Sequence, residues 1–424
     1  MATLYWRGGA PAVAQVDTLT PSNVEAGDVF TATINGKSVS YTAVGTSPSV
    51  ADVVAGLVSA WNASTIPEFM EITATDSTTH VTLTADTAGK PFTVTAAATD
   101  GGGTDDQDLT QATTTANSGP YCWDTVANWW TGSAVASAIP VTGDTVIFEN
   151  NNVSCLYGLA QSAVTLVALH FRASYTGYVG LPRTANSGAS NQYHEYRATY
   201  LAISATSVII GDGPGSGSGR IKLNTGLAQT EVLVKDTGTT AETNVPAVLW
   251  KGVHSSNAIK VDRGTAGIGF FSEDGATVGS VTVGEASLTT DSEAEVTLGL
   301  LVTATLVYNL GGTVTVPVDC SITQYAGTCY VTDDAAITAL TLYGGTCYYD
   351  SDGTCTAAHI TGTIDFRRDA RAKTFTSVTL YNGYAWLDPS GRVTVTNGWD
   401  FSRCGPQDGT FQIGDHQTLT ASAI

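Results

Sequence analysis

The chain has few charged side chains and few of the residues that build long helices. Charged residues make up 13% of its 424 positions, against about 25% in an average soluble domain. Methionine occurs 2 times and Lys and Arg together 18 times, whereas glycine occurs 45 times. Long helices depend on Leu, Glu, Lys and Arg. The composition therefore favours strands joined by turns of small residues.

Positive charge is the scarcer sign. The chain has 38 acidic and 18 basic residues, which gives a formal net charge of −20. Its densest basic segment contains Arg367, Arg368, Arg371 and Lys373, and Asp369 interrupts it. Proteins that bind nucleic acids or anionic membranes normally present a basic patch. We therefore expect no nucleic-acid partner and attribute the acidity to solubility.

Long apolar runs are absent as well. No stretch approaches the 18 apolar residues typical of a membrane-spanning helix, so we expect no membrane insertion. Residues 1–8 contain no basic segment followed by an apolar one, so we expect no secretion signal. The seven cysteines include no CxxC pair and their number is odd. A zinc site or a dense disulfide framework is therefore not expected.

Catalytic motifs are also missing. No HExxH or GxSxG pattern occurs, and the glycine-rich segment 211–219 does not fit GxGxxG. Residues 193–196, Tyr-His-Glu-Tyr, have a composition suited to sugar binding, but we favour the interpretation that they form a polar loop lying on a neighbouring element. Glycoside cleavage needs two nearby carboxylates, which Asp365 and Asp388 could supply from adjacent repeats. We predict no catalytic residue, metal ligand or cofactor, and keep a hydrolase as an alternative.

A repeated phrase near the C-terminus is the strongest positive feature. Its glycines recur at intervals of about 15 to 21 residues, and each phrase follows a segment rich in Thr, Ile, Val and Leu. Such spacing predicts short stacked strands that bury one continuous core. The phrases are Gly312-Thr313-Val314, Gly327-Thr328-Cys329-Tyr330, Gly345-Thr346-Cys347-Tyr348, Gly362-Thr363-Ile364-Asp365 and Gly383-Tyr384-Ala385-Trp386.

The two-residue alternation within these phrases predicts an inner and an outer face. Val314, Cys329, Cys347, Ile364 and Ala385 fall on the inner face, and the two cysteines are expected to stack as small buried hydrophobes. The outer face then carries an aromatic stripe that the core does not need. We predict that a partner buries this stripe. The candidate interface residues on it are Tyr330, Tyr348 and Trp386.

The segment 16–117 has a pattern of its own. Alternation at 29–34, the hairpin pair Asn35-Gly36 and a return strand at 37–43 precede a helical pattern at 50–61, with Ser49 as its N-cap. Strand patterns follow at 71–75, 81–85 and 92–96. The polar segment 100–117 has the composition of a linker or loop. We predict a small inserted ββαββ-like module followed by a linker.

Residues 1–15 and 118–424 are predicted to form one β-helix, or solenoid, interrupted by this insertion. The stretch 4–9 is similar to a first rung, and the rungs resume near residue 121. Three tryptophans at this start would cap the open end of the core. We therefore include Trp123, Trp129 and Trp130 among the candidate interface residues. The predicted fold class is mostly β, a β-helix with a small N-terminal module.

Three features together resemble phage and prophage virion structural proteins. They are the phrase Gly27–Gly36 with its helix and the segment 81–92, the segment Trp123-Asp124-Thr125-Val126-Ala127-Asn128-Trp129, and the stacked strands that follow. The resemblance implies a non-enzymatic capsid decoration or tail spike or fibre component, made in the host cytoplasm and located in the virion. It implies no catalytic residue.

The expected partners are further copies of the chain, arranged as a homotrimer, and other virion proteins of the capsid or tail. A host surface glycan is an additional candidate partner. Two alternatives from other classes stay open. One is a polysaccharide-degrading tailspike, and the other is a cell-surface adhesin or filament subunit.

Overall fold

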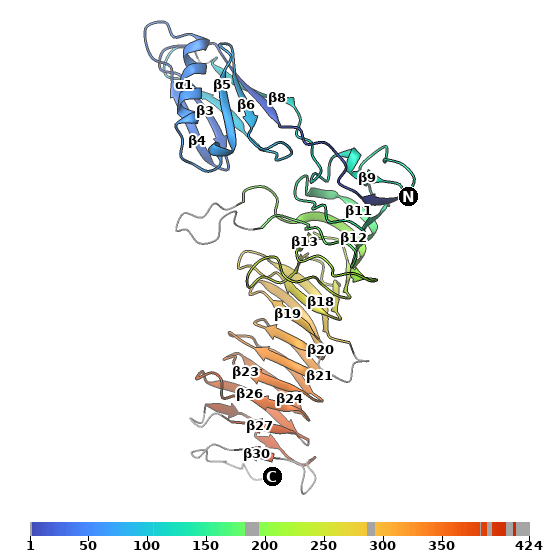
Figure 1. The fold of residues 1–424 in the computed structure, drawn as a ribbon. Helices are drawn as coiled ribbons and strands as arrows, with labels where there is room; N and C mark the ends of the chain where they lie inside the picture. Colours follow the sequence, from blue (N-terminus) through green and yellow to red (C-terminus); the bar gives the residue numbers. More distant parts are fainter. Residues whose placement is uncertain are drawn as a thin grey trace.

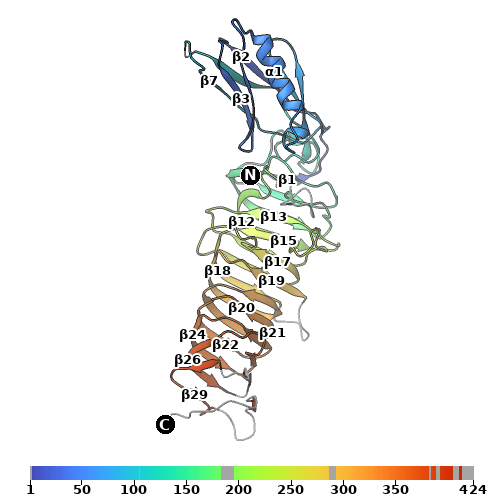
Figure 2. The same cartoon turned by 90° about the vertical axis from the view of Figure 1, so that its left-hand side faces the viewer.

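The computed structural model describes residues 2–104, 106–182, 195–285, 293–381, 383–387, 392–403 and 410–412. Within them the protein is mostly β, with one α-helix. Figure 1 shows an elongated molecule with a small α+β module at one end and the C-terminal strands at the other. The view turned by 90° shows the same elongation, with strands stacked along the long axis (Figure 2).

The module consists of two antiparallel sheets and the helix. One sheet has the strand order β5-β6-β2-β8 and the other β4-β3-β7. Its elements are β2 (Val16–Ser22), β3 (Val29–Ile34), β4 (Lys37–Thr42), α1 (Val50–Asn62), the 3-10 turn η1 (Phe69–Glu71), β5 (Ile72–Asp76), β6 (Val81–Ala85), β7 (Thr95–Thr99) and β8 (Asp108–Thr115).

Local sequence explains most of this module. Asn35 and Gly36 both have positive φ, 52° and 72°, as a tight two-residue hairpin turn requires. The Ser49 side chain accepts a hydrogen bond from the Asp52 amide, and the Asp52 carboxylate accepts one from the Ser49 amide, so α1 begins with a capping box. The helix buries Val53, Val54, Leu57 and Trp61. The predicted hairpin and helix are confirmed.

The segment 100–117 differs from its prediction as a linker. It contains β8, which pairs with β2 along its length. Leu109 is buried there, whereas the Thr residues that follow are exposed. A strand that buries one apolar side chain shows almost no alternation, so its sequence is indistinguishable from that of a polar loop.

All other strands belong to one large sheet, here called the main sheet. They are β1 (Thr3–Trp6), β9 (Trp129–Trp130), β10 (Thr145–Phe148), β11 (Ala160–Arg172), β12 (Leu201–Asp212), β13 (Ile221–Asn224), β14 (Glu231–Val234), β15 (Val248–Lys251), β16 (Ala258–Val261), β17 (Gly264–Ile268), β18 (Ala276–Val283), β19 (Ala294–Leu298), β20 (Val302–Val316), β21 (Cys320–Val331), β22 (Ile337–Leu342), β23 (Thr346–Tyr349), β24 (Thr354–Ile360), β25 (Thr363–Asp365), β26 (Lys373–Leu380), β27 (Tyr384–Trp386), β28 (Val393–Val395), β29 (Trp399–Asp400) and β30 (Thr410–Gln412).

The N-terminal strand β1 belongs to the main sheet, although the module separates it in sequence from the other strands of that sheet. β1 pairs in parallel with β10 and antiparallel with β9, so residues 3–6 lie beside residues that follow the module in sequence. The short 3-10 turn η2 (Val126–Asn128) leads into β9. Residues 16–115 meanwhile form the two sheets of the module, which has its own buried cluster around Phe30, Leu57 and Trp61.

The main sheet corrects the predicted fold class. Its strand order closes into a barrel through β1, β10 to β30 and β9, and further pairings join alternate strands such as β12 with β14. The fold is a closed parallel β-barrel with extra strands, and the predicted β-helix solenoid is wrong. The Gly-Thr repeats indicated which strands are parallel neighbours. Such a repeat is local and carries no information about the closure of a sheet.

The predicted inner face of the repeats is confirmed. Val314, Cys329, Cys347, Ile364 and Ala385 follow one another in register on β20, β21, β23, β25 and β27. All five are buried. The six described cysteines are buried free thiols, as expected for small core residues. The hydrogen bond with Cys329 and burial hold the pKa of Cys347 well above its ordinary value.

Candidate interaction surface

The predicted aromatic stripe exists as a row of residues in strict register. Thr315, Tyr330, Tyr348, Asp365 and Trp386 face one another on successive parallel strands from β20 to β27. We call these five residues the outer column. Because they alternate with buried inner-face residues, they point away from the core. Tyr330, Tyr348 and Trp386 are each partly exposed, so all three predicted residues lie on one surface.

Two tyrosines of the outer column form a stack. The ring centroids of Tyr330 and Tyr348 are 5.2 Å apart, and the ring planes differ by 10°. The guanidinium carbon of Arg368 lies 4.7 Å from the Tyr330 centroid and 4.9 Å from the Tyr348 centroid. A guanidinium at this distance is attracted by the electron-rich face of each ring. Arg368 therefore covers part of the tyrosine stack that we predicted a partner would bury.

Asp365 holds a second arginine over the remaining aromatic residue. Arg367 donates to both carboxylate oxygens of Asp365, with Nε–Oδ1 2.9 Å and Nη2–Oδ2 2.7 Å. This bidentate geometry fixes the guanidinium, whose carbon lies 4.3 Å from the Trp386 ring centroid. Burial alone would raise the pKa of Asp365, but the hydrogen bonds and charge of Arg367 outweigh it and lower that pKa.

Both arginines come from the turn between β25 and β26, and the interior holds that turn in place. Lys373, which is completely buried, donates from Nζ to the carbonyl oxygens of Asp369 and Arg371, each at 2.8 Å. Arg371 donates to the Asp369 carboxylate at 2.8 Å. The side chains of Arg367 and Arg368 remain 46% and 49% exposed. The turn thus adds two accessible cations to the aromatic surface.

Sequence reasoning missed Arg367 and Arg368 as members of this surface. The basic segment was weighed only as a nucleic-acid site. A usable signal was nevertheless present, because these arginines follow directly after Asp365 and Phe366 at the end of a repeat. A side chain just beyond a strand can fold back over the row of residues beside it.

The three tryptophans predicted as interface residues have a different environment. Trp123 and Trp129 are 0% exposed, and their ring centroids are 4.6 Å apart. Trp6 packs against Trp129 at 5.1 Å. The indole of Trp129 donates to the Trp123 carbonyl at 2.8 Å. These two tryptophans fill the interior and have no surface to offer a partner, whereas Trp130 is partly exposed on β9.

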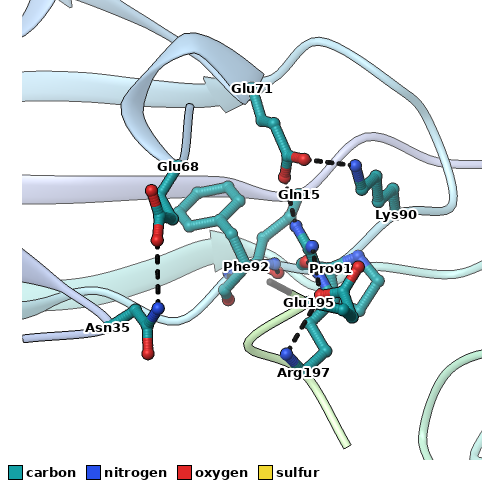
Figure 3. Close-up of polar contacts among 9 residues, drawn as sticks. All are labelled: Gln15, Asn35, Glu68, Glu71, Lys90, Pro91, Phe92, Glu195 and Arg197. Atoms are coloured by element: carbon teal, nitrogen blue, oxygen red, sulfur yellow. Dashed lines mark hydrogen bonds and ion pairs between the residues drawn. The ribbon is translucent and has the colours of Figure 1, made fainter. Parts of the chain in front are cut away.

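Figure 3 shows how the module contacts the main-sheet region. Arg197 donates to Glu71 of the module at 2.6 Å, to Glu195 at 2.9 Å and to the Pro91 carbonyl at 2.5 Å. Lys90 also pairs with Glu71, at 2.5 Å. The Arg197 side chain is only 9% exposed. Such a satisfied, nearly buried network fixes the docking of the module.

This junction bears on the predicted sugar-binding loop. Glu195 pairs with Arg197, and Tyr196 packs against the core of the module. Both residues therefore serve contacts within the chain, as expected for a polar loop lying on a neighbouring element. Tyr193 and His194 lie outside the described residues.

A second polar network occupies the main-sheet region. The Tyr200 hydroxyl donates to Asp274 Oδ2 at 2.5 Å, and Lys251 pairs with Asp274 Oδ1 at 2.6 Å. Lys222 is completely buried and donates to the Leu181 carbonyl at 2.8 Å. Burial lowers the pKa of Lys222 to about 8. This network was not predicted, since its members lie far apart along the chain.

The residues considered for glycoside cleavage do not form a visible carboxylate pair. Asp365 is engaged by Arg367, and Asp388 lies outside the described residues. Among the positions that the structure describes, no group of three or more His, Cys, Asp or Glu side chains could hold a metal ion. No helix in those parts of the chain has the length and hydrophobicity needed to cross a membrane.

Comparisons with known proteins add no relative. No protein-family model matches the chain, and no curated protein matches it either. Nothing in the comparisons or in the structure indicates a phage or a virion, so those terms rest on the resemblance described above. The closed main sheet also overturns the expectation of a solenoid.

Proposed function

We propose that the chain is a non-enzymatic structural protein that assembles with further copies of itself through the outer column. The observation that carries this proposal is the combination of Tyr330, Tyr348 and Trp386 with the exposed Arg367 and Arg368 on a rigid sheet. Tyrosine, tryptophan and arginine dominate the energetics of protein interfaces. The sheet holds them in fixed positions, so little conformational entropy is lost on binding.

The mixed charges beside the outer column support self-association, although the net charge of the chain opposes it. The chain is strongly acidic, so two copies repel one another over most of their surfaces. The turn beside the outer column combines Arg367, Arg368 and Arg371 with acidic residues such as Asp352. A surface that carries both signs can be complementary to a second copy of itself. A closed three-fold arrangement would bury this side of each elongated subunit.

Native mass spectrometry of the full chain tests the proposal. We expect a trimer of the 43.8 kDa chain and a shift toward monomer in the double variant Tyr348→Ser/Arg368→Ala. Tyr178→Ser is a matched control, because Arg220 lies 4.6 Å over the ring of this partly exposed tyrosine, away from the outer column. A wild-type monomer, or a double variant that remains fully trimeric, would contradict the proposal.

A further inference from the structure

A second row of side chains begins at Tyr325 in β21 and continues just beyond the ends of β22, β24 and β26, and one position in this row lacks an aromatic ring. The amides of Tyr343, Thr361 and Tyr381 donate to the carbonyls of Gln324, Leu342 and Ile360, at 2.8, 2.7 and 2.8 Å. With Tyr325, which follows Gln324, these residues occupy four successive levels. The order is Tyr325, Tyr343, Thr361 and Tyr381, so a threonine stands between two tyrosines.

The first two positions of the row, Tyr325 and Tyr343, each carry an aromatic ring, and the two rings stack. The rings of Tyr325 and Tyr343 stack with centroids 5.0 Å apart and planes that differ by 22°. Tyr325 and Tyr343 are 51% and 56% exposed. At the third position Thr361 contributes only a short polar side chain, so no aromatic side chain of this row lies between Tyr343 and Tyr381.

The space left by Thr361 is a cavity of about 440 Å³. Its lining consists of Thr341, Leu342, Tyr343, His359, Thr361 and Tyr381. This volume lies within the range of about 300 to 1,000 Å³ typical of small-molecule sites. The His359 ring lies 6.2 Å from that of Tyr381, so an imidazole borders the same space.

The dimensions of this space indicate the kind of ligand. Neighbouring strands lie about 4.8 Å apart, so Tyr343 and Tyr381 are separated by about 9.6 Å along the stack. A flat ring touching both tyrosines at about 3.5 Å would need only about 7 Å. A pyranose chair is thicker than a flat ring and presents C–H groups on both faces, so it fills the gap more completely.

The polar groups around the cavity suit the same ligand. Thr341 and Thr361 each provide a hydroxyl that both donates and accepts, and His359 provides a donor and an acceptor. Sugar hydroxyls at the rim of a ring need such mixed partners. We propose that the chain binds a neutral pyranose ring between Tyr343 and Tyr381, over Thr361. This site is separate from the outer column and goes beyond the proposed assembly function.

Saturation-transfer NMR with the full chain tests the site. The probes are the methyl glycosides of glucose, galactose, mannose and N-acetylglucosamine, at up to about 50 mM, because a single small ring is expected to bind at millimolar concentration. We expect saturation transfer to at least one glycoside. Thr361→Tyr supplies the missing ring, closes the cavity and should reduce the signal to background.

Two further variants keep the test decisive. Thr356→Tyr adds the same side chain at an exposed position of β24 outside the cavity and should leave binding unchanged. Tyr381→Ser removes one wall and should also abolish the signal, which covers the case that Thr361→Tyr fails to fold. The proposal is overturned if no glycoside shows transfer, or if binding survives in both Thr361→Tyr and Tyr381→Ser. It is also overturned if Thr361→Tyr changes the oligomeric state while no glycoside binds, because the occupant would then be a side chain of another copy.

Discussion

Two groups of aromatic residues were predicted to meet a partner, and the structure places them in opposite environments. Trp123 and Trp129, near the start of the main sheet, are completely buried among Trp6 and Phe148. Tyr330 and Tyr348 in the C-terminal half are partly exposed and stacked beside an arginine. Residue type alone therefore does not assign an aromatic residue to core or surface: the outer tyrosines follow the alternation of their strands, whereas Trp123 lies in no strand and is buried by distant contacts.

The two regions also differ in what stabilises them. Trp123 and Trp129 each contact other rings, and Trp129 donates its indole N–H to a carbonyl, so removal of either side chain would leave a cavity. The outer column lies over a complete inner face, where Tyr330 and Tyr348 contact each other and two half-exposed arginine side chains lie over the rings. Loss of an outer ring therefore costs only the pairwise contact.

The largest expected effect on stability follows from removing one of the buried tryptophan side chains. Trp129→Ala should lower the free energy of unfolding by about 3 to 5 kcal/mol, as for other buried aromatic residues. Trp386→Ala, which removes the same side chain from the outer column, should cost about 1 kcal/mol. Urea unfolding of both variants measures the difference. Equal losses in the two variants would show that the outer column is part of the core.

The buried ammonium group of Lys222 provides a second comparison between the interior and the surface, through the pH dependence of stability. Burial lowers the pKa of Lys222 from 10.5 to about 8, so the folded protein loses this proton before the unfolded chain does. Because the unfolded state binds more protons between pH 8 and 10.5, stability rises with pH across this window. The gain is at most about 3 kcal/mol.

Lys222→Met isolates this contribution. The methionine variant should lack the rise, whereas the buried thiols titrate in both proteins and cancel in the difference. Unfolding measured at pH 7.5 and at pH 10 gives that difference. If wild type and variant respond identically to pH, Lys222 is solvated in the folded state.

Sequence reasoning succeeded where one face of a strand is buried in a regular repeat. The register of Val314, Cys329 and Cys347, and the opposite orientation of Tyr330 and Tyr348, follow from a two-residue period. Helix α1 was predictable because its capping residues and apolar spacing are local. These features depend only on residues that are close in sequence.

The remaining features depend on distant contacts. Three of them join segments that are far apart in sequence and share no repeat. They are the closure of the main sheet, the Arg197 junction and the environment of Lys222. The Trp129 environment was missed for the same reason, since β9 has two residues and shows no alternation. At the outer column the aromatic rings were predicted, but the arginines over them were missed, although they follow directly after Asp365 and Phe366 at the end of a repeat.

The smallest expected effect concerns the ion pair that orients Arg367 on the outer column. The lowered pKa of Asp365 means that its pairing stabilises the fold above the pKa of the unfolded chain and is lost as pH falls through the folded value. Arg367 is 46% exposed, so the contribution is screened and should not exceed about 1 kcal/mol. Asp365→Asn should therefore be slightly less stable than wild type at pH 7, and the difference should be smaller near pH 3, as measured by urea unfolding at both values. Fluorescence of Trp386 should change in the variant at pH 7, because Arg367 is released from the indole face. Unchanged fluorescence together with unchanged stability would mean that Arg367 is held over Trp386 by the ring alone.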